Sequence, residues 1–217
     1  HELGTPLGTI AVAVRELELA LERGDAVDQP ISDARLIAAE VERCRLILGG
    51  MAAETHADDL QPIATSAEGL FAALRSRFDA DRAERIVTRA PATDEPLRIP
   101  QPAVVRALAA LVKNAFDATS REDDEVDVEL DLREPGTVRL VVRDHGRGMD
   151  AETRARAGEP FFTTKNPGAG MGLGLFIVRS FAESIGGRLE LRAAIPAGTE
   201  AVLVVPRAHP SAEVAAQ

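Results

Sequence analysis

The sequence of 217 residues predicts an α+β protein, in which an N-terminal helical hairpin dimerises into a four-helix bundle and an α/β sandwich follows. Apolar residues recur every three or four positions over residues 1–56, which is the heptad pattern of paired helices. Beyond them, helical periods are interleaved with runs in which apolar and polar residues alternate, as in half-buried strands. We therefore expect a hairpin over residues 1–58, a second domain over residues 61–207 and a frayed tail over residues 208–217.

Two apolar seams define the hairpin. A turn with Gly24, Asp25 and Asp28 to Pro30 separates them, and the second helix is expected to end at Gly49-Gly50 or slightly later. Two such helices cannot cover their own apolar stripe, so we expect a homodimer in which two hairpins pair. The seams consist of Leu3, Leu7, Ile10, Val14, Leu17 and Leu21 in the first helix, and of Ala34, Ile37, Val41, Cys44, Leu48 and Met51 in the second.

The second domain alternates helical and strand patterns. Pro102 opens a long helix, because proline is accepted in the first turn, and Pro135-Gly136 marks the turn of a β-hairpin. In order, we expect a helix at 67–78, a strand at 85–88, a loop at 91–100, a helix at 102–119, strands at 126–132 and 138–142, a long functional loop at 145–172, a helix at 173–185, and strands at 188–192 and 200–205.

Composition excludes several classes of protein. The net charge of −10 argues against a nucleic-acid binder, which needs basic residues to replace phosphate counterions, and the 3% aromatic content leaves few stacking platforms. A single cysteine indicates a reducing compartment, and no apolar run reaches the roughly 18–20 residues of a membrane span. Because the first residue is His1 rather than Met, we expect a fragment of a longer protein, in which any membrane or sensory segment would lie upstream.

Two glycine-rich segments are candidates for a functional site, and the second of them is a candidate for phosphate binding. Asp144-His145-Gly146-Arg147-Gly148 follows a strand, and Gly170-Met171-Gly172-Leu173-Gly174-Leu175 enters a helix. Free amides and the positive dipole end favour phosphate at a helix N-terminus. Either glycine group alone has an ordinary alternative, namely a loop glycine that needs positive φ.

Five motifs in this order resemble the N, G1, F, G2 and G3 boxes of the Bergerat ATP-binding fold, whose family includes histidine kinases, Hsp90, MutL and type II topoisomerases. The resemblance covers residues 61–207. The five motifs are Leu111–Ala118, Asp144–Gly148, Phe161–Lys165, Gly170–Leu175 and Gly198-Thr199.

The resemblance implies a site for ATP and Mg²⁺. Asn114 would ligate Mg²⁺ through its amide oxygen, and Asp144 would accept the adenine amino group. The loop 145–172 would form a lid over the nucleotide. The remaining implied nucleotide contacts are Lys113, Asp117, Gly146, Gly148, Thr164, Lys165, Gly170, Gly172, Leu173, Gly174, Leu175 and Thr199.

The positions of the two lysines support the resemblance, whereas Ala110 and Asp117 depart from the family pattern. Of 25 basic residues only Lys113 and Lys165 are lysines, and both fall in the motifs, where a triphosphate needs a movable cation; chance placement is the alternative. Ala110 stands where many histidine kinases have a second Asn and ATP-hydrolysing relatives have a Glu that activates water. Asp117 stands where a basic residue is common, which puts one phosphate contact in doubt.

The first seven residues, His1-Glu2-Leu3-Gly4-Thr5-Pro6-Leu7, resemble the H box of sensor histidine kinases. The resemblance implies that His1 accepts the phosphoryl group. Glu2 is placed to set the imidazole tautomer, with an exposed helix Glu as the alternative, and Thr5 would position water for a phosphatase reaction. The same heptapeptide looks like that of the redox-responsive RegB/PrrB group, in which a cysteine of this region is a proposed switch. Cys44 is therefore either a redox group or a small buried hydrophobe.

We therefore expect the cytoplasmic core of a sensor histidine kinase of a two-component system, and the resemblance implies that it is the cytoplasmic portion of an inner-membrane kinase. It would autophosphorylate His1, pass the phosphoryl group to an aspartate of a response-regulator receiver domain, and also dephosphorylate that regulator. The alternatives are a degenerate kinase that acts as an ATP-binding scaffold, and an ATPase of the Hsp90 and MutL kind.

Overall fold

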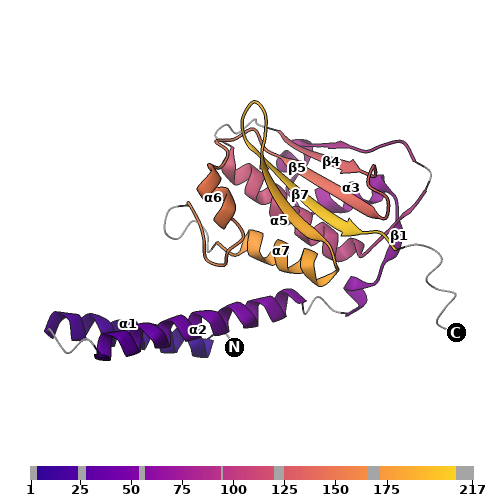
Figure 1. Cartoon of the computed structure of the whole chain (residues 1–217). Helices are drawn as coiled ribbons and strands as arrows, with labels where there is room; N and C mark the ends of the chain where they lie inside the picture. The colour runs from indigo at the N-terminus through magenta and orange to yellow at the C-terminus, as the bar shows by residue number, and fades with distance from the viewer. Residues whose placement is uncertain are drawn as a thin grey trace, which may run out of the picture. The chain divides into compact units, whose positions relative to one another are not determined.

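The computed structural model describes residues 4–23, 28–53, 57–93, 95–119, 125–165 and 172–208. The chain forms two compact units, His1–Ala53 and Glu54–Gln217 (Figure 1). Each unit is described by itself. No helix in the described ranges is long and apolar enough to cross a lipid bilayer.

The first unit contains α1 (Gly4–Arg23) and α2 (Asp28–Ala53), which pack side by side. The buried side chains between them are small, with Ala13 and Cys44 both 2% exposed. The prediction that residues 28–30 belong to the turn is wrong, because α2 begins at Asp28 and accommodates Pro30 in its first turn.

The expected seam of α1 is only partly covered by α2. Val14 is 39% exposed and Leu21 is 65% exposed, although both are apolar seam positions. The residues that face α2 include Ala13 and Ala20, which stand one position before them. The heptad pattern of α1 therefore carries a second apolar face that α2 leaves open.

The second unit is an α+β sandwich, as predicted, with a five-stranded sheet in the order β2-β4-β5-β7-β6. Strand β2 runs parallel to β4, and all other neighbours are antiparallel. The strands are β2 (Ile86–Arg89), β4 (Val126–Asp131), β5 (Thr137–Arg143), β6 (Arg188–Ala193) and β7 (Thr199–Pro206). A separate antiparallel pair joins β1 (Ile63–Thr65) to β3 (Leu97–Ile99).

Helices cover one face of the sheet, as Figure 1 shows for α5 and α7. The long helix α5 (Gln101–Ala118) directs its apolar stripe at alternate residues of β4 and β5, so that Leu108, Val128 and Leu140 are each 0% exposed. The other helical segments are η1 (Ala57–Leu60), α3 (Ala67–Arg75), α4 (Ala80–Glu84), α6 (Ala151–Arg156) and α7 (Gly174–Ser184).

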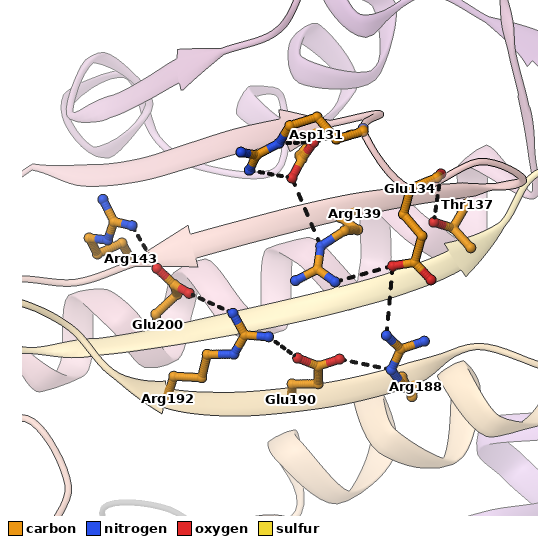
Figure 2. Close-up of polar contacts among 10 residues, drawn as sticks. Asp131, Glu134, Thr137, Arg139, Arg143, Arg188, Glu190, Arg192 and Glu200 are labelled. Carbon is orange, nitrogen blue, oxygen red and sulfur yellow. Dashed lines mark hydrogen bonds and ion pairs between the residues drawn. The ribbon is translucent and has the colours of Figure 1, made fainter.

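The opposite face of the sheet carries a network of ion pairs, which Figure 2 shows. Glu200 accepts from Arg143 at 2.6 Å and lies 3.7 Å from Arg192, so that one carboxylate links strands β5, β7 and β6. Val202 and Val204 are 0% and 1% exposed although they lie outside the helix-facing core. In the strand register, Val204 lies between Arg139 of β5 and Arg188 of β6, whereas Val202 lies between Val141 of β5 and Glu190 of β6.

Several element predictions for the second unit are confirmed, and two are wrong. The predicted helix at 102–119, the β-hairpin around Pro135-Gly136 and the helix at 173–185 correspond to α5, the β4–β5 pair and α7. The predicted loop at 91–100 is wrong, because it contains β3. The long loop at 145–172 is interrupted by α6, whose first turn is capped by the side chain of Asp150.

Candidate functional site

A buried carboxyl group, that of Asp144, lies where β5 ends. The residue is 5% exposed, and its Oδ1 accepts hydrogen bonds from the amides of Gly146 at 2.9 Å and Thr199 at 3.2 Å. Burial raises the pKa of Asp144, and the hydrogen bonds from Gly146 and Thr199 oppose that rise. The result is a fixed hydrogen-bond acceptor at the end of β5.

Glycines allow the main chain to close around this carboxyl group. A Cβ on Gly146 would lie 2.2 Å from the carbonyl oxygen of Ala118, at the end of α5. A Cβ on Gly198, where φ is +105°, would lie 1.9 Å from the carbonyl oxygen of Asp144. Only glycine permits these approaches. They bring the loop after β5, the start of β7 and the end of α5 together.

The amide side chain of Asn114 lies against the beginning of α7. A Cβ on Gly174, the first residue of α7, would lie 3.5 Å from Nδ2 of Asn114. Leu173 at the N-cap supplies no side-chain cap, so the amides of the first turn of α7 have no capping partner of this kind. An amide oxygen and a helix N-terminus are thus adjacent, and both are suited to an anion with a bound cation.

The loop after α6 is attached to α5 and to the loop after β5. Nζ of Lys165 donates to Oδ2 of Asp117 on α5 at 2.6 Å. Nη2 of Arg147 donates to Oγ1 of Thr164 at 3.2 Å. Lys113 is exposed on α5, and no ion pair is recorded for it within the described ranges. The structure therefore joins Lys165 to Asp117 and Thr164 to Arg147, and Lys113 lies one helical turn before Asp117 on α5.

Other predicted site residues have mixed outcomes. Gly148 and Gly172 have φ values of +71° and +69°, and Leu175 packs against the core. Cys44 is buried, which favours the packing interpretation of this residue over the redox one. Thr5 lies in α1, but its side chain is outside the description, as are all of His1, Glu2 and Gly170.

Sequence reasoning missed an arginine that ties α7 to the end of α6. Nη2 of Arg179 donates to the carbonyl oxygen of Ala157 at 2.7 Å, and a Cβ on Gly158 would lie 2.8 Å from the guanidinium group. The only sequence signal for this contact is Gly158, because the contact joins residues that lie 22 positions apart.

Sequence reasoning also missed the contact of His145, the residue after Asp144, with Asp127 on the adjacent strand β4. Nε2 of His145 is 3.0 Å from Oδ2 of Asp127, and Asp127 also pairs with Arg89. Burial acts to raise the pKa of Asp127, but the hydrogen bonds from Arg89 and His145 outweigh it, and the pKa is lowered. These contacts of Asp127 thus anchor His145, the first residue of the loop that follows Asp144.

Comparisons with known proteins agree with this geometry. Residues 100–209 match the family described as histidine kinase-, DNA gyrase B-, and HSP90-like ATPase. The sensor histidine kinase RegB of Cereibacter sphaeroides is 32% identical over 205 residues, which cover 87% of this chain and 42% of that protein. The chain spans less than half the length of the curated relatives RegB and the C4-dicarboxylate transport sensor protein DctB of Pseudomonas aeruginosa.

Solved structures show the same fold. The mycobacterial sensor histidine kinase MprB is 26% identical with a TM-score of 0.56, and the match covers 68% of this chain and 97% of that one. Full-length ShkA in complex with AMPPNP is 21% identical with a TM-score of 0.63, over 84% of this chain and 40% of that one. The family match spans more than half of the 217 residues and contains Asn114, Asp144, Gly174 and Thr199. The chain therefore belongs to the histidine kinase-, DNA gyrase B-, and HSP90-like ATPase family, and it is homologous to sensor histidine kinases.

Proposed function

We propose that the chain is the core of a sensor histidine kinase. It binds Mg·ATP in residues 61–207, transfers the γ-phosphoryl group to His1, and passes it to an aspartate of a response-regulator receiver domain. One observation carries the proposal. Within one unit, the buried carboxyl group of Asp144 follows β5, and the amide of Asn114 on α5 lies against the start of α7.

Asp144 would bind the base. Both of its recorded main-chain donors act on Oδ1, so Oδ2 is the oxygen that we propose for the adenine amino group. The hydrogen bonds from Gly146 and Thr199 fix the orientation of the carboxylate before the base arrives. A Cβ on Gly198 would lie 3.1 Å from Oδ1 of Asp144, so the glycine keeps this side of the carboxylate free of a side chain.

Asn114 and the first turn of α7 would hold the triphosphate. The uncapped amides after Leu173 present donors and a positive dipole end to phosphate oxygens. The Asn114 amide oxygen is a hard ligand that fits Mg²⁺, with phosphate oxygens and water as the other ligands. When bound, the ion neutralises charge on the transferring phosphoryl group. Gly174 allows the phosphate end and Asn114 to be this close.

His1 would be the acceptor. A neutral imidazole nitrogen attacks the γ-phosphorus, the bond from that phosphorus to the β–γ bridging oxygen breaks, and ADP leaves. Glu2 would hold the other ring N–H and so set the tautomer. Thr5 would orient water for the reverse task, the hydrolysis of phosphoaspartate on the regulator. The support is the similarity to RegB, which covers 87% of this chain.

The homodimer would form through α1 and α2. The described parts of these helices expose five large apolar side chains, namely Val12, Val14, Leu21, Ile31 and Leu36. Val14 and Leu21 are seven positions apart and so share one face of α1, which a second copy would cover in a four-helix bundle. We expect Leu21→Glu to convert the dimer to a monomer in sedimentation equilibrium, because it places a charge on the proposed interface, whereas Glu22→Gln on the outer surface leaves the dimer intact. A Leu21→Glu variant that remains dimeric contradicts this arrangement.

Incubation with Mg²⁺ and ATP labelled at the γ-phosphate tests the function and separates its alternatives. A kinase gives base-stable, acid-labile label on the protein, and His1→Gln abolishes it. Release of labelled phosphate without labelled protein indicates an ATPase, which Ala110 disfavours because no carboxylate stands at that position. Binding without either product indicates a scaffold.

A further inference from the structure

One ion pair joins the loop after α6 to the last turn of α5. Nζ of Lys165 and Oδ2 of Asp117 are 2.6 Å apart, and the two side chains are 31% and 33% exposed. The residues are 48 positions apart in the sequence. The pair is therefore a tertiary contact, and it forms where the resemblance leads one to expect a basic residue on α5.

Helical geometry places this pair near the proposed phosphate site. Asp117 follows Asn114 by three positions, so the two side chains lie on the same face of α5. Asn114 in turn lies against Gly174 at the start of α7. An ammonium group held by Asp117 is thus close to the amide and the helix end that we propose for the triphosphate.

The backbone around Lys165 is held as well. Its amide donates to Oγ1 of Thr163 at 3.1 Å, and the neighbouring Thr164 accepts from Arg147. A lysine side chain loses much rotamer freedom when it is fixed in one place. With the stem already tethered at both ends, less of this entropy is lost when a phosphate binds.

We propose that Asp117 is a positioning residue, which holds the ammonium group of Lys165 beside Asn114 so that it contacts the β- and γ-phosphates of ATP. Lys165 thereby supplies from the loop the positive charge that α5 lacks at position 117. The carboxylate of Asp117, once paired, no longer repels the nucleotide. This inference rests on the proposed function and names a further determinant of its phosphate specificity.

Calorimetric titration with ATP and with AMP tests the inference, because AMP lacks the β- and γ-phosphates. We expect Asp117→Asn and Lys165→Ala each to weaken ATP binding about tenfold, as for a half-exposed charged hydrogen bond, with AMP binding unchanged. The double variant should bind ATP no more weakly than Lys165→Ala, since both changes remove one interaction. Asp117→Glu should restore part of the ATP affinity.

The matched control is Asp59→Asn, which removes another ion pair of α5, that of Arg106 with Asp59 at 2.9 Å. It should leave both affinities unchanged. Tighter ATP binding by Asp117→Asn would mean that Asp117 competes with the phosphates, and equal losses for ATP and AMP would mean a merely structural role; either result overturns the inference, as does an unchanged ATP affinity. Absence of ATP binding by the unsubstituted chain overturns the proposed function itself.

Discussion

A methyl group added at Gly146 measures how closely the loop after β5 packs against the end of α5. The Cβ of Gly146→Ala would lie 2.2 Å from the carbonyl oxygen of Ala118, whereas ordinary contacts begin at 3.4 Å. The loop or the helix end must therefore move by about 1.2 Å, the difference between these two distances. Main-chain atoms on both sides leave no flexible side chain to absorb this movement.

A movement of the loop, rather than of the helix end, breaks a hydrogen bond of the candidate site. The amide of Gly146 is 2.9 Å from Oδ1 of Asp144, and a displacement of about 1.2 Å away from it exceeds any hydrogen-bonding distance. Loss of a hydrogen bond to a charged group costs about 1.5–3 kcal/mol, so ATP affinity should fall about 10- to 150-fold. Overpacking should also lower the free energy of unfolding by about 1–3 kcal/mol.

Calorimetric ATP titration and urea unfolding measure these two losses. Gly136→Ala is the control, because Gly136 has φ of +76° and a Cβ there would meet no heavy atom within 4 Å. It should cost about 1–2 kcal/mol of stability through backbone strain alone and leave ATP affinity unchanged. A Gly146→Ala variant that binds ATP within about twofold of the parent would refute the reasoning.

Three further substitutions test the packing of the second unit. Arg133 holds the pKa of Asp131 at about 2, below the unfolded value of 3.8, so this pairing stabilises the protein above pH 3.8 and ceases to do so as the pH falls through 2. Asp131→Asn should accordingly lose about 1 kcal/mol in urea unfolding at pH 7, a value reduced for solvent screening, and the loss should vanish near pH 2; a pH-independent loss would contradict it. Gly187→Ala places a Cβ 2.1 Å from the carbonyl oxygen of Val204 and should lower the unfolding free energy by about 1–3 kcal/mol, which an unchanged urea midpoint would disprove. Leu70→Ala empties a position that is 0% exposed and should cost about 2–5 kcal/mol, so a loss below about 1 kcal/mol would count against the described core.

The long elements of the second unit could be predicted because their patterns are strong. The 18 residues of α5 have Pro102 in the first turn and a continuous helical period, and Pro135-Gly136 separates two alternating runs. Strand β3 was missed for a physical reason. It has three residues between prolines, and it is a strand because Ile63–Thr65, far away in the sequence, pairs with it.

In the helical unit, the heptad pattern predicts which residues are apolar but not which neighbouring helix each of them faces. The spacing identifies Val14 and Leu21 as seam residues, and both are apolar as expected, yet they are exposed in the single chain. A bundle helix has two kinds of neighbour, its own partner helix and a helix of the second copy. Spacing alone does not say which neighbour each side chain faces.

The motif residues of the candidate site could be predicted from the sequence, but the contacts between their side chains could not. Asp144 and its glycines were identified because the stretch Asp144–Gly148, in order with four other motifs, resembles a box of the Bergerat ATP-binding fold. The ion pair of Asp117 with Lys165 was not predicted, because each residue was considered separately as a nucleotide contact. A side-chain contact across 48 residues leaves no local pattern in the sequence.

The ATP affinity of Asp144→Asn tests most directly whether this unit binds an adenine nucleotide where we propose. Asp150→Asn is its control, since Asp150 caps α6 by accepting from the amide of Thr153 at 2.7 Å, and asparagine caps a helix equally well. Calorimetry should show a loss of about 10- to 150-fold for Asp144→Asn, because a charged acceptor is removed, and no change for Asp150→Asn. Equal ATP affinities for Asp144→Asn and the parent chain would contradict the account.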